Sequence, residues 1–169
     1  MDIIDAIRTR RSIRKFDKRP VPENLIELIL KSAMQAPSAR NFQPWHFVII
    51  DDRNKLREIP KFHPYTAMLE TAPLAIAVCG DLSLEKSMEY IALDCAAATQ
   101  NMLLAAHGLG LGAVWLGIYP RENRIKGLAD LLKLPEHIIP VTLIALGYPA
   151  ENPPPASRFK PQRIHRNVW

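Results

Sequence analysis

An unbroken stretch of helix-forming residues in the middle of the chain constrains its fold more than any other feature. The stretch reads LEKSMEYIALDCAAATQNMLLAAHGLG over residues 84–110, and Gly108 and Gly110 close it as glycines typically close a helix. Successive alanines at 96–98 leave room for a second helix to approach closely. The sequence therefore predicts one long helix in a central position.

Four short apolar segments lie on either side of this predicted helix. The segments WHFVIID and PLAIAVCGD precede it, and GAVWLGIY and IPVTLIALGY follow it. Short apolar runs of this kind, rich in β-forming residues, are typical of core strands. Because strands and helices are mixed and no internal repeat is present, the pattern favours a single α/β or α+β unit.

Two helices are predicted before the first strand. DIIDAIRTRR places Ile3, Ile4 and Ile7 on one helical face. VPENLIELILKSAMQ begins with Pro22 after a valine, and proline is suited to a first helical turn. The buried stripe that we expect on this second helix consists of Leu25, Ile29 and Ala33.

Length and composition limit the classes of protein that the chain can form. A chain of 169 residues with 48% hydrophobic and 23% charged residues is large enough for one globular core. No apolar run approaches the roughly 20 residues of a membrane helix, and Asp2 and Asp5 are untypical of a signal peptide. Cys79 and Cys95 lie in apolar surroundings, which predicts buried thiols in a reducing cytoplasm and no disulfide.

The net charge of +5 is concentrated at the two ends of the chain. Residues 1–20 carry seven Lys or Arg against three Asp, and residues 151–169 carry four against Glu151. The remaining residues therefore carry a net charge of −2. If the two ends meet in space, they form an anion site.

The last 19 residues, ENPPPASRFKPQRIHRNVW, differ in character from the rest of the chain. Five are charged and four are proline, which leaves too few apolar residues for a core of their own. The terminal Trp169 argues that this segment lies across another surface. We therefore expect residues 1–150 to fold as one unit and residues 151–169 to form an extended tail.

A basic segment, RTRRSIRKF, follows the first predicted helix and has two interpretations. Its cations surround Ser12 and are Arg8, Arg10, Arg11, Arg14 and Lys15. They could be a solvated helix end that complements the helix dipole, or a phosphate site in which arginine side chains bind phosphate oxygens bidentately. A nucleic-acid interface is disfavoured, because no aromatic residues alternate with the cations and no recognition motif is present.

Two further segments admit a functional interpretation. APSARNFQPWHFVII sets polar residues between Pro37 and Pro44, directly before a strand, and is either a surface loop anchored by Trp45 or part of a site. GAVWLGIYP ends with Gly117 and Pro120, where backbone groups could face a flat ligand, although a glycine there is more often part of a turn.

Taken together, these segments resemble the nitroreductase family of flavin mononucleotide (FMN) oxidoreductases. RRSIRKF, APSARNFQPW, GLGAVWLGIYP, SRF and IHRNVW occur in the order and spacing of that family over nearly the whole chain. The resemblance implies an α+β fold with a small, mostly antiparallel sheet flanked by helices. It also implies an intertwined homodimer whose C-terminal tail, residues 151–169, crosses to the partner chain and extends the partner's sheet, with FMN bound at the interface.

The resemblance also implies roles for particular residues. The FMN phosphate and ribityl chain are expected to contact Arg10, Arg11, Ser12, Arg158 and Lys160. Arg14 is expected near N1 and the C2 carbonyl of the flavin, where a cation stabilises the reduced state. The partner-chain wall of the site is expected to consist of Pro37, Ser38, Ala39, Asn41 and Gln43. The strand along the flavin ring is expected to comprise Trp115, Leu116 and Gly117, with a backbone N–H bonded to N5.

The activity implied by the resemblance is a ping-pong reaction. NAD(P)H delivers a hydride to the flavin, and a nitroaromatic, quinone or similar acceptor then takes it. No side chain is required as an acid or base, and His46, His63, His107, His137 and His165 show no metal-ligand spacing.

One departure from the family pattern leaves the acceptor open. Larger relatives place an amide and a lysine at the ring edge, where HPYTAML has neither. Alternatives on the same fold are reductive dehalogenation, flavin fragmentation or a non-enzymatic flavin-binding role.

Overall fold

The computed structural model describes residues 1–154 and 156–169, and its four strands form one antiparallel sheet. The strands are β1 (Trp45–Ile50), β2 (Leu74–Asp81), β3 (Gly112–Gly117) and β4 (Ile138–Gly147), each at a segment predicted to be a strand. Their order in the sheet is β1-β2-β4-β3, and every neighbouring pair is antiparallel. The fold is therefore α+β, as the resemblance implied.

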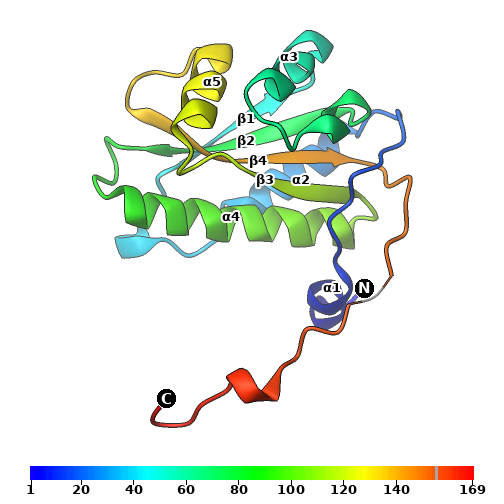
Figure 1. The fold of residues 1–169 in the computed structure, drawn as a ribbon, viewed down its shortest axis with the longest axis vertical. Helices are drawn as coiled ribbons and strands as arrows, with labels where there is room; N and C mark the ends of the chain where they lie inside the picture. The colour runs from blue at the N-terminus through cyan, green and yellow to red at the C-terminus, as the bar shows by residue number, and fades with distance from the viewer. Residues whose placement is uncertain (155) are drawn as a thin grey trace.

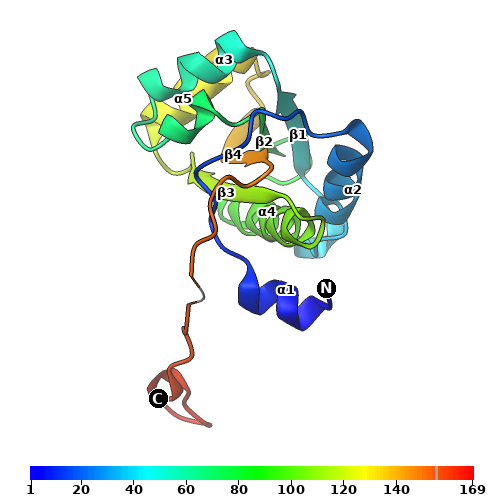
Figure 2. The same cartoon turned by 90° about the vertical axis from the view of Figure 1, so that its right-hand side faces the viewer.

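Helices cover both faces of the sheet (Figure 1). The α-helices are α1 (Ile3–Thr9), α2 (Glu23–Ala33), α3 (Arg53–Glu58), α4 (Met88–Gly108) and α5 (Glu122–Leu132). Short 3-10 helices are η1 (Ala39–Asn41), η2 (Ile59–Lys61), η3 (Ala67–Glu70) and η4 (Pro161–Arg163). One face packs on α2 and α4 and the other on α3, α5 and the turns beside them (Figure 2). Because both faces are covered, β2 and β4 are buried along almost their whole length.

The central helix is shorter than the predicted 84–110. It begins at Met88, because the Ser87 hydroxyl accepts the Tyr90 N–H and caps the helix. The carboxylate of Glu85 accepts the Ser87 N–H at 2.8 Å, which occupies the residues before the cap in a turn. The predicted central position is confirmed, since one face of α4 is buried against the sheet and α2.

Both cysteines are buried free thiols, as predicted. Burial raises the pKa of Cys79 and of Cys95 to about 12, so neither forms a reactive thiolate at neutral pH.

The two N-terminal helices differ from their predictions in detail. The buried residues of α2 are Ile26, Ile29 and Ala33, whereas Leu25 is half-buried, so the buried stripe was predicted one residue too early at its start. The α1 face with Ile3, Ile4 and Ile7 is formed but lies exposed. Helices α3 and α5 were not predicted.

The segment after α1 runs along the outer edge of β3. Ser12 bridges Ala113 in parallel, and the Ile13 N–H donates to the Ala113 carbonyl at 3.0 Å. This close approach requires Gly112, because a Cβ there would lie 2.8 Å from the Ile13 side chain. The N-terminal arginines are thereby fixed beside the start of β3.

The two chain ends project from the body of the molecule (Figures 1 and 2). In the tail, Phe159, Ile164 and Trp169 are 76%, 65% and 99% exposed, so these apolar side chains have little contact with their own chain. None of the helices in the described part of the chain has the length and apolarity required to cross a bilayer.

Candidate functional site

A cavity of about 980 Å³, here called the basic pocket, lies where the two ends of the chain meet. It is lined by Met1, residues of α1 and the two arginines after it, His107 near the end of α4, and residues 152–154 and 156–159 of the tail. Four arginines face it against one carboxylate, that of Asp5, among the described residues; they are Arg8, Arg10, Arg11 and Arg158. The condition stated for an anion site, that the two basic ends meet in space, is fulfilled.

The charges in the basic pocket are not balanced within the chain. Burial lowers the pKa of Arg10, and the nearby positive charges of Arg158 and Arg11 lower it further. Arg11 donates to three backbone carbonyls, including that of Pro154 in the tail at 3.1 Å. No ion pair of the described residues includes Arg10 or Arg158. A bound anion would relieve this crowding of like charges.

His107, in the last turn of α4, also lines the basic pocket and was not predicted as a site residue. The Thr9 hydroxyl donates to the Asp5 carbonyl at 2.6 Å, so its oxygen is left to accept from His107 Nε2 at 2.8 Å. Burial, Arg10 and Arg11 together lower the pKa of His107. The imidazole is therefore a neutral group whose charge state will respond to an anion in the pocket.

The segment that follows Arg11 out of the basic pocket pairs with the start of β3, where Ser12 bridges Ala113. In an antiparallel ladder, the backbone groups of alternate residues point away from the partner strand. Ala113 is such a residue, because its carbonyl accepts from Ile13, and the alternation places the backbone groups of Trp115 and Gly117 on the same free edge. Leu116 lies between them with its backbone directed toward β4. The edge between Ala113 and Gly117 is about 13 Å long.

The Gly117 carbonyl is held at the end of this edge. His63 Nε2 lies 3.0 Å from its oxygen, and Arg124 donates to it from Nη1 at 2.8 Å. Both residues were missed by the sequence analysis. The amphipathic stretch ENRIKGLADLL could have indicated a helix at α5, but not the contact that Arg124 makes across the fold.

The loop between Pro37 and Pro44 has an unusual backbone. Arg40, Asn41 and Gln43 adopt left-handed conformations, with φ of 53°, 58° and 50°. Such residues cost free energy and persist where their surroundings fix them. Residues 37–44 contain no glycine, the residue that most often adopts this conformation, so the sequence did not indicate it.

The start of α4 and the turn before it fix this loop. Asp94 accepts the Ala39 N–H at 3.0 Å, and the buried carboxylate of Glu85 pairs with Arg40. Within the loop, the Ser38 hydroxyl accepts the Gln43 N–H at 3.0 Å, and the Gln43 amide donates to Asn41 at 2.9 Å. Several of the polar atoms expected to face the cofactor thus also shape the loop itself.

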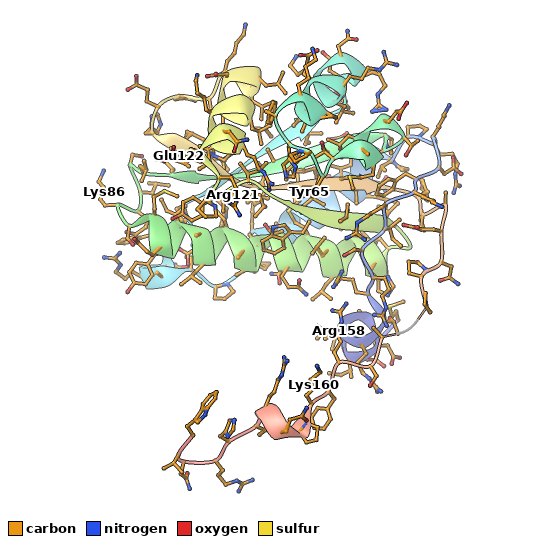
Figure 3. All side chains as sticks on the ribbon, in the orientation of Figure 1. Tyr65, Lys86, Arg121, Glu122, Arg158 and Lys160 are labelled. Carbon is orange, nitrogen blue, oxygen red and sulfur yellow. The ribbon has the colours of Figure 1, made fainter. Side chains whose placement is uncertain are left out.

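The structure does not bring all of the predicted site residues together in one chain. The loop is tied to Asp94 near the start of α4, whereas the basic pocket contains His107 near its end, about 20 Å away along the helix. Arg14 is exposed, with its backbone N–H bonded to the Glu151 carboxylate. Lys160 lies beyond Arg158 on the tail and does not line the pocket (Figure 3).

The arrangement can hold a long ligand with an anionic end and a flat ring. The pocket supplies cations for a phosphate, and the edge of β3 beyond the pairing of Ile13 with Ala113 presents backbone groups that a ring could meet from the side. Within residues 1–154 and 156–169, no group of three or more His, Cys, Asp or Glu side chains is placed to hold a metal ion.

Comparisons with known proteins show the family of the chain. The profile described as "Nitroreductase family" matches residues 7–68 and 61–148. A candidate NADH dehydrogenase/NAD(P)H nitroreductase of Methanothermobacter thermautotrophicus is 54% identical over 169 residues, covering 100% of this chain and 88% of the relative.

Solved structures give the same result. An FMN-dependent nitroreductase of Clostridium difficile superposes with a TM-score of 0.91 at 29% identity, covering 98% of this chain and 99% of that one. A candidate nitroreductase of Desulfovibrio desulfuricans, solved in complex with FMN, gives a TM-score of 0.85 at 32% identity and covers 100% of this chain and 98% of that one.

Proposed function

The chain belongs to the nitroreductase family and is an NAD(P)H-dependent flavin oxidoreductase with FMN as its cofactor, and from this premise we propose that it reduces nitroaromatic, quinone or similar acceptors. When bound, FMN would accept a hydride from NAD(P)H and pass it to the acceptor in a ping-pong sequence. The observation that carries the proposal is that the arginines of the basic pocket lead directly into Ser12 and Ile13, which pair with Ala113 at the start of β3.

The residues of this chain would bind and orient the cofactor. Arg10 and Arg158 are available to bind the phosphate, while Arg11 ties the tail to the end of α1. Ser12 follows directly and is fixed by its bridge to β3, so its hydroxyl is placed for the ribityl chain. Trp115 and Gly117 would direct backbone N–H groups toward the ring. Arg14 would supply positive charge near N1 and the C2 carbonyl.

We propose that the complete site is formed by two copies of the chain. The loop before β1 is tied to α4 at Asp94, too far from the His107 end of that helix for the loop to reach a ligand in the basic pocket of its own chain. The loop residues concerned are Pro37, Ser38, Ala39, Asn41 and Gln43. A second copy would supply them as the opposite wall. Exposed apolar side chains support such an interface, and they include Ile3, Ile4, Ile7, Tyr90 and Leu93, all at least 48% exposed.

The tail fits the same arrangement. We propose that residues 1–150 are the FMN-binding unit and that residues 151–169 pack on the partner chain, where β1 offers an edge to extend. Phe159, Ile164 and Trp169 would be the apolar contacts, and Lys160 would approach the phosphate once the tail is docked. The exposure of all three apolar side chains in the single chain supports this proposal.

The test of the activity begins with the purified full chain. FMN released on denaturation should amount to about one per chain, as two sites in a dimer require. Stopped-flow absorbance should then show flavin reduction by NADH or NADPH and reoxidation by a nitroaromatic or quinone. A colourless protein that fails to bind added FMN would contradict the proposal, and an FMN-bound protein reduced by neither nucleotide would point to a binding role instead.

The test of the tail is truncation after Ala150. Light scattering and FMN titration should show that dimerisation and FMN affinity fall together, because the deletion removes both the interfacial segment and Arg158. A truncated chain that remains dimeric with full FMN affinity would show that the tail contributes to neither.

A further inference from the structure

The carbonyl oxygen of Gly117 accepts hydrogen bonds from side chains of two other elements. His63, in the turn after η2, and Arg124 of α5 provide the donors. A carbonyl oxygen has two lone pairs, so these donors saturate it. Close packing brings α5 to this turn, because a Cβ at Gly127 would lie 2.4 Å from the ring of Phe62. Two separate elements thus hold one peptide group at the end of β3.

The contacts of His63 define its tautomer. The Tyr65 N–H donates to Nδ1 at 3.3 Å, so Nδ1 is an acceptor and the proton lies on Nε2. Nε2–H is then the donor to Gly117. The side chain is buried, and burial together with the charge of Arg124 lowers the pKa of His63, which keeps the ring neutral. His63 is therefore a fixed donor to Gly117 at neutral pH.

Arg124 brings an uncompensated positive charge to the same peptide group. It is half-buried and lies over the exposed ring of Tyr65, with Cζ 5.5 Å from the ring centroid. No ion pair among the described residues includes it. On the same helix, Lys126 is instead exposed and paired with Asp130 at 2.6 Å. The charge of Arg124 is thus directed to the end of β3, and that of Lys126 is not.

Resting on the proposed function, in which the flavin ring lies along Trp115 and Gly117, we propose that Arg124 is a positioning residue that raises the reduction potential of the bound flavin. It does so by fixing the Gly117 carbonyl, on the same residue as the N–H proposed to meet the ring, and by placing a cation beside it. A hydride carries two electrons and one proton, so its arrival adds one negative charge to the ring. A fixed cation nearby stabilises that charge. The segment HPYTAML lacks a lysine or asparagine at this edge, and Arg124 supplies the charge from α5.

The test compares two single substitutions on α5 in the FMN-bound full chain. Arg124→Gln keeps an N–H donor and removes the charge, and Lys126→Gln removes a charge from an exposed position on the same helix. We expect Arg124→Gln to lower the equilibrium constant for two-electron reduction of bound FMN about tenfold, or about 30 mV in midpoint potential. Lys126→Gln should leave the potential unchanged, and Arg124→Lys should restore most of it.

The outcomes separate this inference from the proposed function. A wild-type chain that binds no FMN would overturn both. A wild-type chain that binds and reduces FMN, with Arg124→Gln and Lys126→Gln giving equal potentials, would overturn the inference alone. Nitrogen-15 NMR of the FMN-free wild-type chain adds a measurement that needs no variant. It should show His63 as the neutral Nε2–H tautomer, and a proton on Nδ1 would contradict the proposed clamp on Gly117.

Discussion

Replacement of Arg10 by glutamine should weaken FMN binding through the phosphate and through no other part of the ligand. Arg10 is half-buried in the basic pocket, with Arg11 and Arg158 as its charged neighbours. A hydrogen bond to a charged group contributes about 1.5–3 kcal/mol. Because Arg10 is partly exposed and its loss also relieves repulsion among the arginines, we expect a value around or somewhat below the lower end of that range.

The expected result is a loss of about 1–2 kcal/mol, which corresponds to a roughly 5- to 30-fold increase in the Kd of FMN. Titration followed by flavin fluorescence measures this value. Riboflavin, which has the same ring and ribityl chain without the phosphate, is the matched ligand. Its Kd should be unchanged by Arg10→Gln, and the difference between the two ligands should shrink as salt concentration rises, because salt screens charges.

The chain also offers a matched control and an independent readout. Lys126→Gln removes one positive charge far from the basic pocket and should change neither Kd. Without FMN, Arg10→Gln should be at least as thermally stable as the wild type, because one of the crowded charges is gone. Equal losses of FMN and riboflavin affinity in Arg10→Gln would refute the assignment of this pocket to the phosphate.

Three further predictions follow from other parts of the molecule. Arg14→Ala should lower the flavin potential by less than Arg124→Gln, because Arg14 is exposed and its charge is screened; an unchanged potential in a variant that binds FMN would place the cation elsewhere. The pKa of His107 in the folded chain lies below its ordinary value of 6.5, so the unfolded chain binds more protons and stability without FMN should fall as pH drops below about 6.5. A phosphate bound in the pocket would raise the pKa of His107 again. FMN should therefore raise the melting temperature at pH 6 more than riboflavin does, and this difference between the two ligands should be smaller in His107→Gln. Gly80→Ala should destabilise the fold by roughly 1–3 kcal/mol, because its Cβ would lie 2.0 Å from Ile91, whereas Gly108→Ala, with open space around it, should be neutral in chemical denaturation.

Features set by local sequence could be predicted, and they include the strands and the long helix. Each strand segment is apolar and short, and the glycines after His107 end α4 near the predicted point. The start of α4 was placed too early because the Glu85 side chain occupies the residues before Ser87, a contact that no periodicity expresses. The excess of arginine and lysine at both ends was visible in the sequence, but their meeting was not, because like charges repel and only the packing of the two ends brings them together.

Contacts between distant segments could not be predicted. His63 and Arg124 are 61 positions apart in the sequence, and only the packing of α5 on the η2 turn brings both to Gly117. His107 has no sequence signal that separates it from an ordinary helix-terminal histidine. The left-handed backbone at Arg40 and its neighbours is imposed by Asp94 and Glu85, which follow the loop by some 50 residues.

The pairing of the N-terminal segment with late parts of the chain sets the order of events during synthesis. Ser12 bridges Ala113, Phe16 bridges Pro149, and the Ala150 N–H donates to the Lys15 carbonyl at 2.8 Å. Chains are made from the N-terminus onward, so the arginines that precede Ser12 are among the first residues to emerge and among the last to be fixed. A nascent chain cannot complete its basic pocket before Arg158 has been translated, so capture of the cofactor in this pocket must follow synthesis of the tail.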